Sequence, residues 1–239
     1  METLQQNVTE RPAFTDIGSD DLALERRTAT LTATYALLFV SVIGAVTGAA
    51  VGMRIPTIRE FFATMIGWVV ALILLNVLPH AAMAMVTRPR GGVLVLALDG
   101  FISGVVISPL VYVAAGISPM LLFLATGVTA AVFLSVTAFV AIMPKKFSAP
   151  RAFVVGAFLS IAAGVVINHY LQLGVLGIVI SAVIAVFGVI VLVSNTARVL
   201  RDPVNTGAIP GALLLFAGIF NVFLGVLNIA VRLLSGRRR

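Results

Sequence analysis

Beyond Arg27 the chain consists of long apolar runs separated by short connectors that are basic or rich in Gly and Pro. Each run is long enough to cross, as an α-helix, the ~30 Å hydrocarbon core of a bilayer. The pattern predicts an all-α, polytopic membrane protein with seven transmembrane helices in a bundle. The expected spans are 28–53, 62–86, 93–114, 119–143, 152–172, 174–197 and 208–234.

Composition supports a membrane protein, because 60% of the residues are hydrophobic and only 10% are charged. A soluble domain carries about 25% charged residues. The net charge of +7 alone would suggest nucleic acid as a partner. However, the basic residues lie in the connectors and at the C-terminus, which is typical of anchors at lipid headgroups. We therefore expect the lipid bilayer, and no nucleic acid, as a partner. The chain has no cysteine, which excludes disulfides and thiol chemistry.

Three regions follow from this distribution. Residues 1–27 form a polar tail with six acidic residues and three arginines, and no apolar stretch marks it as a signal peptide. We expect this tail to have no fold of its own. Residues 28–234 form the transmembrane domain, and 235–239 form a basic C-terminal tail.

The basic connectors predict the orientation, because Lys and Arg are enriched on the cytoplasmic side. The segments on the side of the N-terminus hold ten basic residues: three in the tail, two at 88–90, three at 145–151 and two at 198–201. The opposite loops hold Arg54 and Arg59. We therefore expect a multi-pass protein of the inner (cytoplasmic) membrane with a cytoplasmic N-terminus. Seven crossings would place Arg232 and 237–239 outside, unless the last segment is re-entrant.

Three spans carry small residues every four positions, which lets helix backbones approach closely in lipid. These stripes predict packing between helices of one chain or, alternatively, a homodimer face. The stripes are Gly44, Gly48 and Gly52; Gly100, Gly104 and Ser108; and Gly156, Ser160 and Gly164.

Polar residues also share helix faces in three other spans. They either line a hydrated central cavity or make ordinary hydrogen bonds between helices. The sixth span has Ser181, Gly188 and Asn195; the seventh has Gly218, Asn221, Gly225 and Asn228; the second has Asn76 and His80 around Pro79.

Asp99 is the acidic residue that stands alone within a span, roughly 9 Å below its start at ~1.5 Å per residue. A carboxyl group at that depth is costly, which makes it a candidate functional group. It either takes part in proton or cation passage, or it serves as a structural ion-pair or snorkelling acid, with Arg88 or Arg90 as possible partners. His80 can titrate near neutral pH, but a single histidine is equally a hydrogen-bonded structural residue.

Enzymatic function is not predicted. The chain has no phosphate-binding Walker loop, no HExxH motif and no cluster of metal ligands, and we expect neither metal nor cofactor. The segment 100–104 is similar to the serine motif of rhomboid proteases, but Phe101 stands where that motif needs glycine. No histidine with suitable surroundings follows Ser103 to complete a catalytic pair.

Several segments resemble, in order and spacing, the Bax inhibitor-1 (TMBIM, UPF0005) family, in particular its bacterial YccA-like branch. The resemblance covers most of 28–234. The matching segments are TYALL at 34–38, GVVISP at 104–109, KKFS at 145–148, YLQL at 170–173, ISAV at 180–183 and GALLLFAGIFNVF at 211–223.

The resemblance implies a seven-helix bundle and two alternative functions. One is a pH-sensitive leak of calcium or other cations through an aspartate pair on the last two spans, with Ca²⁺ or H⁺ as permeant ions. Those two positions are Asn195 and Gly218 here, so the acidic pair is absent. The other, which we favour, is modulation of membrane-protein quality control or stress responses by contact with a membrane-bound protease such as FtsH. A metabolite transporter is less favoured, since no inverted repeat is evident.

Overall fold

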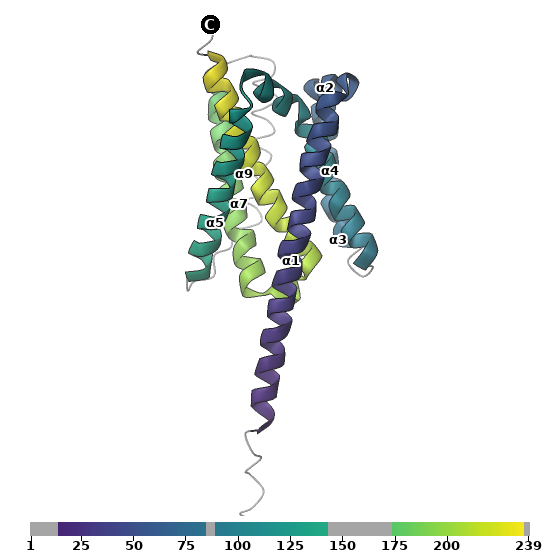
Figure 1. Ribbon diagram of the computed structural model, residues 1–239, viewed down its shortest axis with the longest axis vertical. Helices are drawn as coiled ribbons and strands as arrows, with labels where there is room; N and C mark the ends of the chain where they lie inside the picture. Colours follow the sequence, from purple (N-terminus) through teal and green to yellow (C-terminus); the bar gives the residue numbers. More distant parts are fainter. Residues whose placement is uncertain (1–13, 85–88, 143–173, 237–239) are drawn as a thin grey trace, which may run out of the picture.

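The computed structural model describes residues 14–84, 89–142 and 174–236, which are helical apart from short breaks (Figure 1). Its elements are α1 (Phe14–Arg54), α2 (Pro56–Ala63), α3 (Met65–Ala84), α4 (Pro89–Ile117), α5 (Met120–Ile142), α7 (Gly174–Arg201), α8 (Pro203–Thr206) and α9 (Ala208–Gly236). The protein is therefore all-helical over the described ranges, as predicted.

Five of these helices are long and apolar enough to cross a membrane: α1, α4, α5, α7 and α9. The pair α2 and α3 is bent by 91° at its break and would be a sixth span if taken together. The expected span 152–172 lies outside the described residues. The predicted count of seven is therefore not confirmed; five or six spans are found in the described part of the chain.

The break between α2 and α3 has a local cause at Thr64. Its backbone is extended, and its hydroxyl oxygen accepts a hydrogen bond from the Gly67 N–H at 3.1 Å. A threonine that accepts from the first turn of a helix is a favourable N-cap, so α3 begins anew there. The second span was predicted as one helix from residue 62, and the structure instead turns the chain at residue 64.

Part of the polar tail 1–27, which was expected to have no fold of its own, is helical: residues 14–27 belong to α1, while 1–13 lie outside the described residues. The helix begins at Phe14 and continues unbroken through the first span. Extending an existing helix adds a hydrogen bond for each residue ordered, whereas starting a new helix is costly. The apolar span therefore extends its helix into the polar segment.

The first two glycine stripes face each other across α1 and α4. An added Cβ on Gly48 would collide with the carbonyl oxygen of Phe101, and one on Gly104 would collide with that of Ala45. The backbones thus approach as closely as glycine allows, which is how helices associate in lipid. Packing within one chain is confirmed for these stripes. The third stripe, 156–164, lies outside the described residues.

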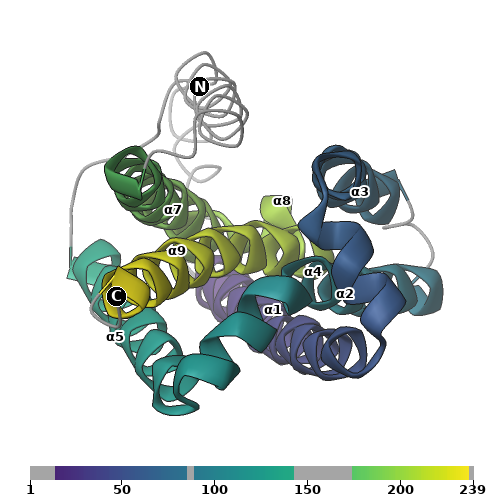
Figure 2. The same ribbon diagram turned by 90° about the horizontal axis from the view of Figure 1, so that it is seen from above.

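Helix α9 occupies the middle of the bundle and contacts α1, α3, α4, α5 and α7 (Figure 2). Small residues again set its distance from α7. A Cβ on Gly188 would lie 2.7 Å from the Val222 nitrogen, and one on Gly225 would lie 2.6 Å from that of Ala185. This central position makes α9 one wall of a cavity that residues of α3, α4 and α7 also border.

Candidate functional site

A cavity of ≈ 500 Å³ lies between α3, α4, α7 and α9. Its volume is within the range of about 300–1,000 Å³ usual for small-molecule sites. Aromatic and aliphatic side chains make most of the wall. The polar and charged side chains on it are Asp99, Ser103, Ser181, Asn221, Asn228 and Arg232.

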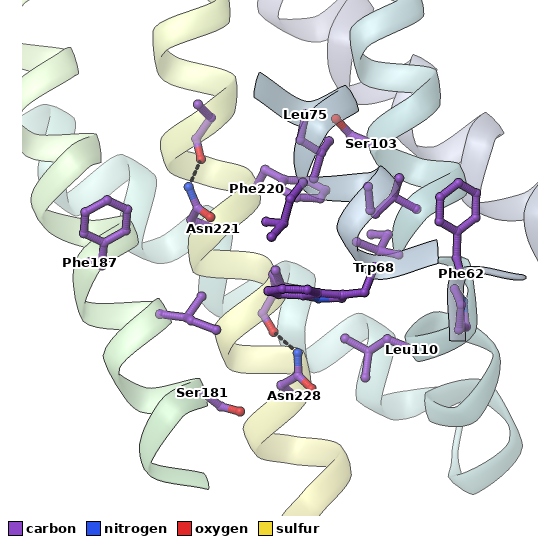
Figure 3. A pocket seen from close by; sticks show the side chains of 18 of the residues that line it. Phe62, Trp68, Leu75, Ser103, Leu110, Ser181, Phe187, Phe220, Asn221 and Asn228 are labelled. Atoms are coloured by element: carbon purple, nitrogen blue, oxygen red, sulfur yellow. Dashed lines mark hydrogen bonds between the residues drawn. The ribbon is translucent and has the colours of Figure 1, made fainter. Parts of the chain in front are cut away.

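Figure 3 shows how these side chains are arranged along the cavity. The Trp68 ring projects from α3 toward α9 and lies near Asn228. Phe187 on α7 and Phe220 on α9 border the space from the other side. Ser103 lies toward one end, with the polar side chains Ser181 and Asn228 toward the other. Most of the wall between these ends is apolar, with the polar side chain of Asn221 between them.

Asp99 on α4 lies at the Ser103 end and is 3% exposed. Among the described residues no hydrogen bond or ion pair engages its carboxyl group. Arg88 lies outside the described residues, as does the side chain of Arg90, so the predicted ion pair stays a prediction. Ser103, one helical turn further along α4, is also buried, at 2% exposed. A carboxyl group held this way can take up a proton or a cation that enters the cavity.

Two asparagines on α9 line the same cavity and also donate hydrogen bonds to backbone carbonyl oxygens of their own helix. The Nδ2 atom of Asn221 donates to the Ala217 carbonyl oxygen at 2.9 Å. The Nδ2 atom of Asn228 donates to the Leu224 carbonyl oxygen at 3.2 Å. Each amide keeps a second N–H and its Oδ1 acceptor for other partners. These two asparagines therefore fit both predicted roles, because they make hydrogen bonds and also line the cavity.

Asn195 and Gly218, to which the resemblance assigned the positions of an aspartate pair, are not among the cavity-lining residues. The Nδ2 atom of Asn195 donates across to the carbonyl oxygen of Leu214 on α9 at 2.7 Å. A Cβ added to Gly218 would lie 2.9 Å from the Cα atom of Leu192 on α7. Both residues therefore join α7 to α9 rather than face open space.

The remaining predicted residues do not gather at this cavity. His80 on α3 is exposed and is not among the lining residues. Asn76 belongs to α3, and its side chain lies outside what the structure describes. Over the described ranges, no three His, Asp or Glu side chains come together as a metal site.

Arg232 is the functional candidate that sequence reasoning missed. It was grouped with the basic C-terminus, yet its side chain lines the cavity. Its Nε atom is buried without a hydrogen-bond partner, and its guanidinium lies against Gly177 on α7. The available signal was its spacing of four from Asn228, because residues four apart share a helix face.

Comparisons with known proteins agree with the earlier resemblance. The family described as "Bax1-I: Inhibitor of apoptosis-promoting Bax1" matches residues 27–239. "Modulator of FtsH protease YccA" of Escherichia coli K12 is 27% identical over 144 residues, which is 59% of this chain and 64% of that protein. "Inner membrane protein YccA" of Escherichia coli O6:H1 matches to the same extent. The aligned region thus spans less than two thirds of these relatives. Because the family match covers nearly the whole chain, this protein belongs to the Bax inhibitor-1 family and is similar to its YccA-like branch.

Proposed function

We propose that this protein modulates membrane-protein quality control by binding a membrane-bound protease of the FtsH type. The observation that supports the proposal most is the similarity to a relative named as a modulator of FtsH protease. Family membership and the apolar helices fit such a role, since the partner would also be anchored in the bilayer. No catalytic chemistry is required, because a modulator acts by contact.

The projecting start of α1 offers a surface for this contact. The Nη2 atom of Arg27 donates to the carbonyl oxygen of Leu200 near the end of α7, at 3.3 Å. N-terminal to Arg27, α1 extends beyond the ends of the other helices (Figure 1). Leu22 and Leu24 are 57% and 63% exposed on this extension, among acidic neighbours. Exposed apolar side chains on a charged helix are suited to a protein partner.

Crosslinking followed by purification from native membranes tests this proposal. We expect the full chain to recover a membrane protease, and the double change Leu22→Ser with Leu24→Ser to reduce its recovery severalfold. Leu233→Ser, 53% exposed near the end of α9, is the matched control and should leave recovery unchanged. Recovery of no membrane protease by the unchanged protein would contradict the proposal.

The orientation proposed with this function has the N-terminus in the cytoplasm. The excess of basic residues on that side supports it. Because the chain has no cysteine, single cysteines at Asp20 and Ser235 can be labelled with a membrane-impermeant maleimide in intact cells. With an odd number of crossings, only Ser235→Cys should react from outside. Labelling of Asp20→Cys from outside would show that the N-terminus is not in the cytoplasm and would contradict the proposed orientation.

We propose a cation or proton leak as a second candidate function, and Asp99 supports it. Its carboxyl group is buried beside a cavity and has no partner among the described residues. Liposomes that contain the protein with calcium- and pH-sensitive dyes measure such a leak. Asp99→Asn keeps the shape of the side chain but not its charge, so the leak should fall. The control Ser103→Ala tests whether the loss of a polar group alone lowers the leak. If Asp99→Asn and the unchanged protein leak equally, Asp99 takes no part in the mechanism.

A further inference from the structure

We propose that the cavity between α3, α4, α7 and α9 holds a phospholipid, with its phosphodiester group on Arg232 and an acyl chain along the apolar wall. This site is separate from the N-terminal part of α1 that we propose for the protease contact. It shares its cavity with Asp99, which the proposed leak uses, but lies at the other end of it. It uses a charged residue that neither of the functions above employs.

The first argument is the missing counter-charge of Arg232. Its Nε atom is buried with no hydrogen-bond partner, and no carboxylate pairs with its guanidinium in the described ranges. A cation within a bilayer is costly unless an anion accompanies it. The other acidic side chains do not meet this need. Glu60 is exposed on α2, while Asp202 and the acids of the N-terminal segment belong to the far ends of α7 and α1.

Asp99 lines the same cavity but is at the wrong depth to neutralise Arg232. It lies roughly 27 Å along α4 from Ile117 at ~1.5 Å per residue. The end of α4 at Ile117 and the end of α9 at Gly236 are on the same side of the bundle (Figure 1). Arg232 is one helical turn from Gly236, so the two charges lie at opposite ends of the cavity. The anion for Arg232 must therefore come from outside the described chain.

The second argument is that the wall around Arg232 is shaped for its guanidinium. A Cβ at Gly177 would collide with the Nη1 atom, so the group rests on the α7 backbone where any other residue would displace it. Ser181, one turn further, donates its hydroxyl to the Gly177 carbonyl oxygen at 2.7 Å. Asn228, one turn before Arg232, keeps an amide N–H for a further acceptor. Guanidinium and amide N–H groups together match the oxygens of a phosphodiester.

The third argument is the apolar remainder of the cavity. Between Asn228 and Ser103 most of the wall consists of apolar side chains such as Trp68, Leu110, Phe220 and Leu224, with Asn221 as a polar member (Figure 3). A small hydrated anion would leave this surface without a partner, whereas an acyl chain would cover it. Arg232 also lies one turn from the end of α9, and long basic side chains near helix ends reach the lipid headgroups. The positive charge of Arg232 at one end of the cavity and the largely apolar wall along it together favour a phospholipid as the occupant.

Native mass spectrometry of the full chain in a mild detergent tests this inference. We expect the protein to retain a phospholipid, and Arg232→Gln to retain about tenfold less or lower still, because a buried anion contact carries at least that much binding. The control Arg198→Gln removes an equal charge from an exposed position of α7 and should retain lipid as the unchanged protein does. Equal retention by Arg232→Gln and the unchanged protein would overturn the proposal, as would an equal loss in Arg198→Gln.

Two further experiments test the proposal independently of the folding of Arg232→Gln. If Arg232→Gln fails to fold, Gly177→Ala displaces the guanidinium and should also lower retention, whereas Gly127→Ala, which meets nothing within 4 Å, should not. Added phosphatidylglycerol should raise the thermal stability of delipidated protein more than an equal concentration of inorganic phosphate. Equal stabilisation by both would identify a site for a free anion and overturn the lipid.

Discussion

Replacing Gly104 with alanine tests the close approach of α1 and α4, on which the arrangement of the bundle depends. The new Cβ would collide with the Ala45 carbonyl oxygen and lie 2.7 Å from both the Ala45 carbonyl carbon and the Ala49 nitrogen. Ordinary contacts of this kind begin at 3.4 Å, so the deficit is at least 0.7 Å. These atoms belong to the α1 backbone and cannot rotate away. The two helices must therefore move apart.

The expected loss of stability follows from that separation. Overpacking a close-packed interior costs about 1–3 kcal/mol. A radial gap of ~0.5–1 Å forfeits a quarter to a half of the dispersion attraction between facing atoms, which favours the upper part of this range. Alanine is also about 0.8–1 kcal/mol better than glycine within a helix, which offsets part of the loss. The control Gly127→Ala, in an exposed position of α5, gains the same propensity with no neighbour within 4 Å.

The difference between the two variants therefore isolates the clash, at about 2–3 kcal/mol. Thermal unfolding of the purified proteins in one detergent measures it. A chain of this size shifts its Tm by about 2–4 °C per kcal/mol, so Gly104→Ala should unfold roughly 4–12 °C below Gly127→Ala. If the two variants unfold within about 1 °C of each other, α1 and α4 are not in backbone contact at Gly104.

Three other substitutions have smaller expected effects in the same assay. Asn195→Leu removes the 2.7 Å hydrogen bond to the Leu214 carbonyl oxygen. Hydrogen bonds between membrane helices average about 0.6 kcal/mol, so we expect the Tm to fall by ~1–3 °C. An unchanged Tm would mean that this hydrogen bond adds nothing to stability. Arg59→Met removes a guanidinium 3.9 Å from the centre of the Tyr112 ring, worth about 0.5–1 kcal/mol, and Arg59→Lys should restore part of the loss. Asp202→Ala lies at an exposed turn and should change stability by less than ~0.5 kcal/mol; a larger loss would show that the turn at α8 helps hold α7 and α9.

Much of the fold could be predicted from the sequence, because a lipid solvent imposes a local rule. A helix that satisfies its own backbone must be apolar over the bilayer thickness, and that length is visible in one stretch of chain. Six of the seven expected spans coincide with described helices, although the second is bent at Thr64. The count of seven depends on 152–172 and stays a prediction.

Helix continuity was harder to predict at the ends of spans. Polar composition indicated that residues before Thr28 have no fold of their own, and it gave no sign that α1 would begin as early as Phe14. Composition reports whether a segment can bury apolar surface by itself. It does not report that a neighbouring helix has already met the cost of nucleation.

The candidate site depended on tertiary structure to a greater extent. A period of 3.6 residues shows which side chains share one helix face, which is why Asn221 and Asn228 could be grouped in advance. It does not show what that face meets. Asn195 and Gly218 fit the same pattern and pack between α7 and α9, while Asp99 from α4 joins the asparagines at the cavity.

The sequence by itself determined that this protein is built for a lipid solvent, where along the chain most of its long apolar helices lie, and which glycine faces let α1 and α4 approach. Only the tertiary structure decided that Gly104 faces Ala45, that α9 stands in the centre and that Arg232 turns into a cavity against Gly177. The physical reason is that hydrophobicity acts residue by residue along one helix. The partner of each face depends instead on how several helices cross, and that is a property of the whole bundle.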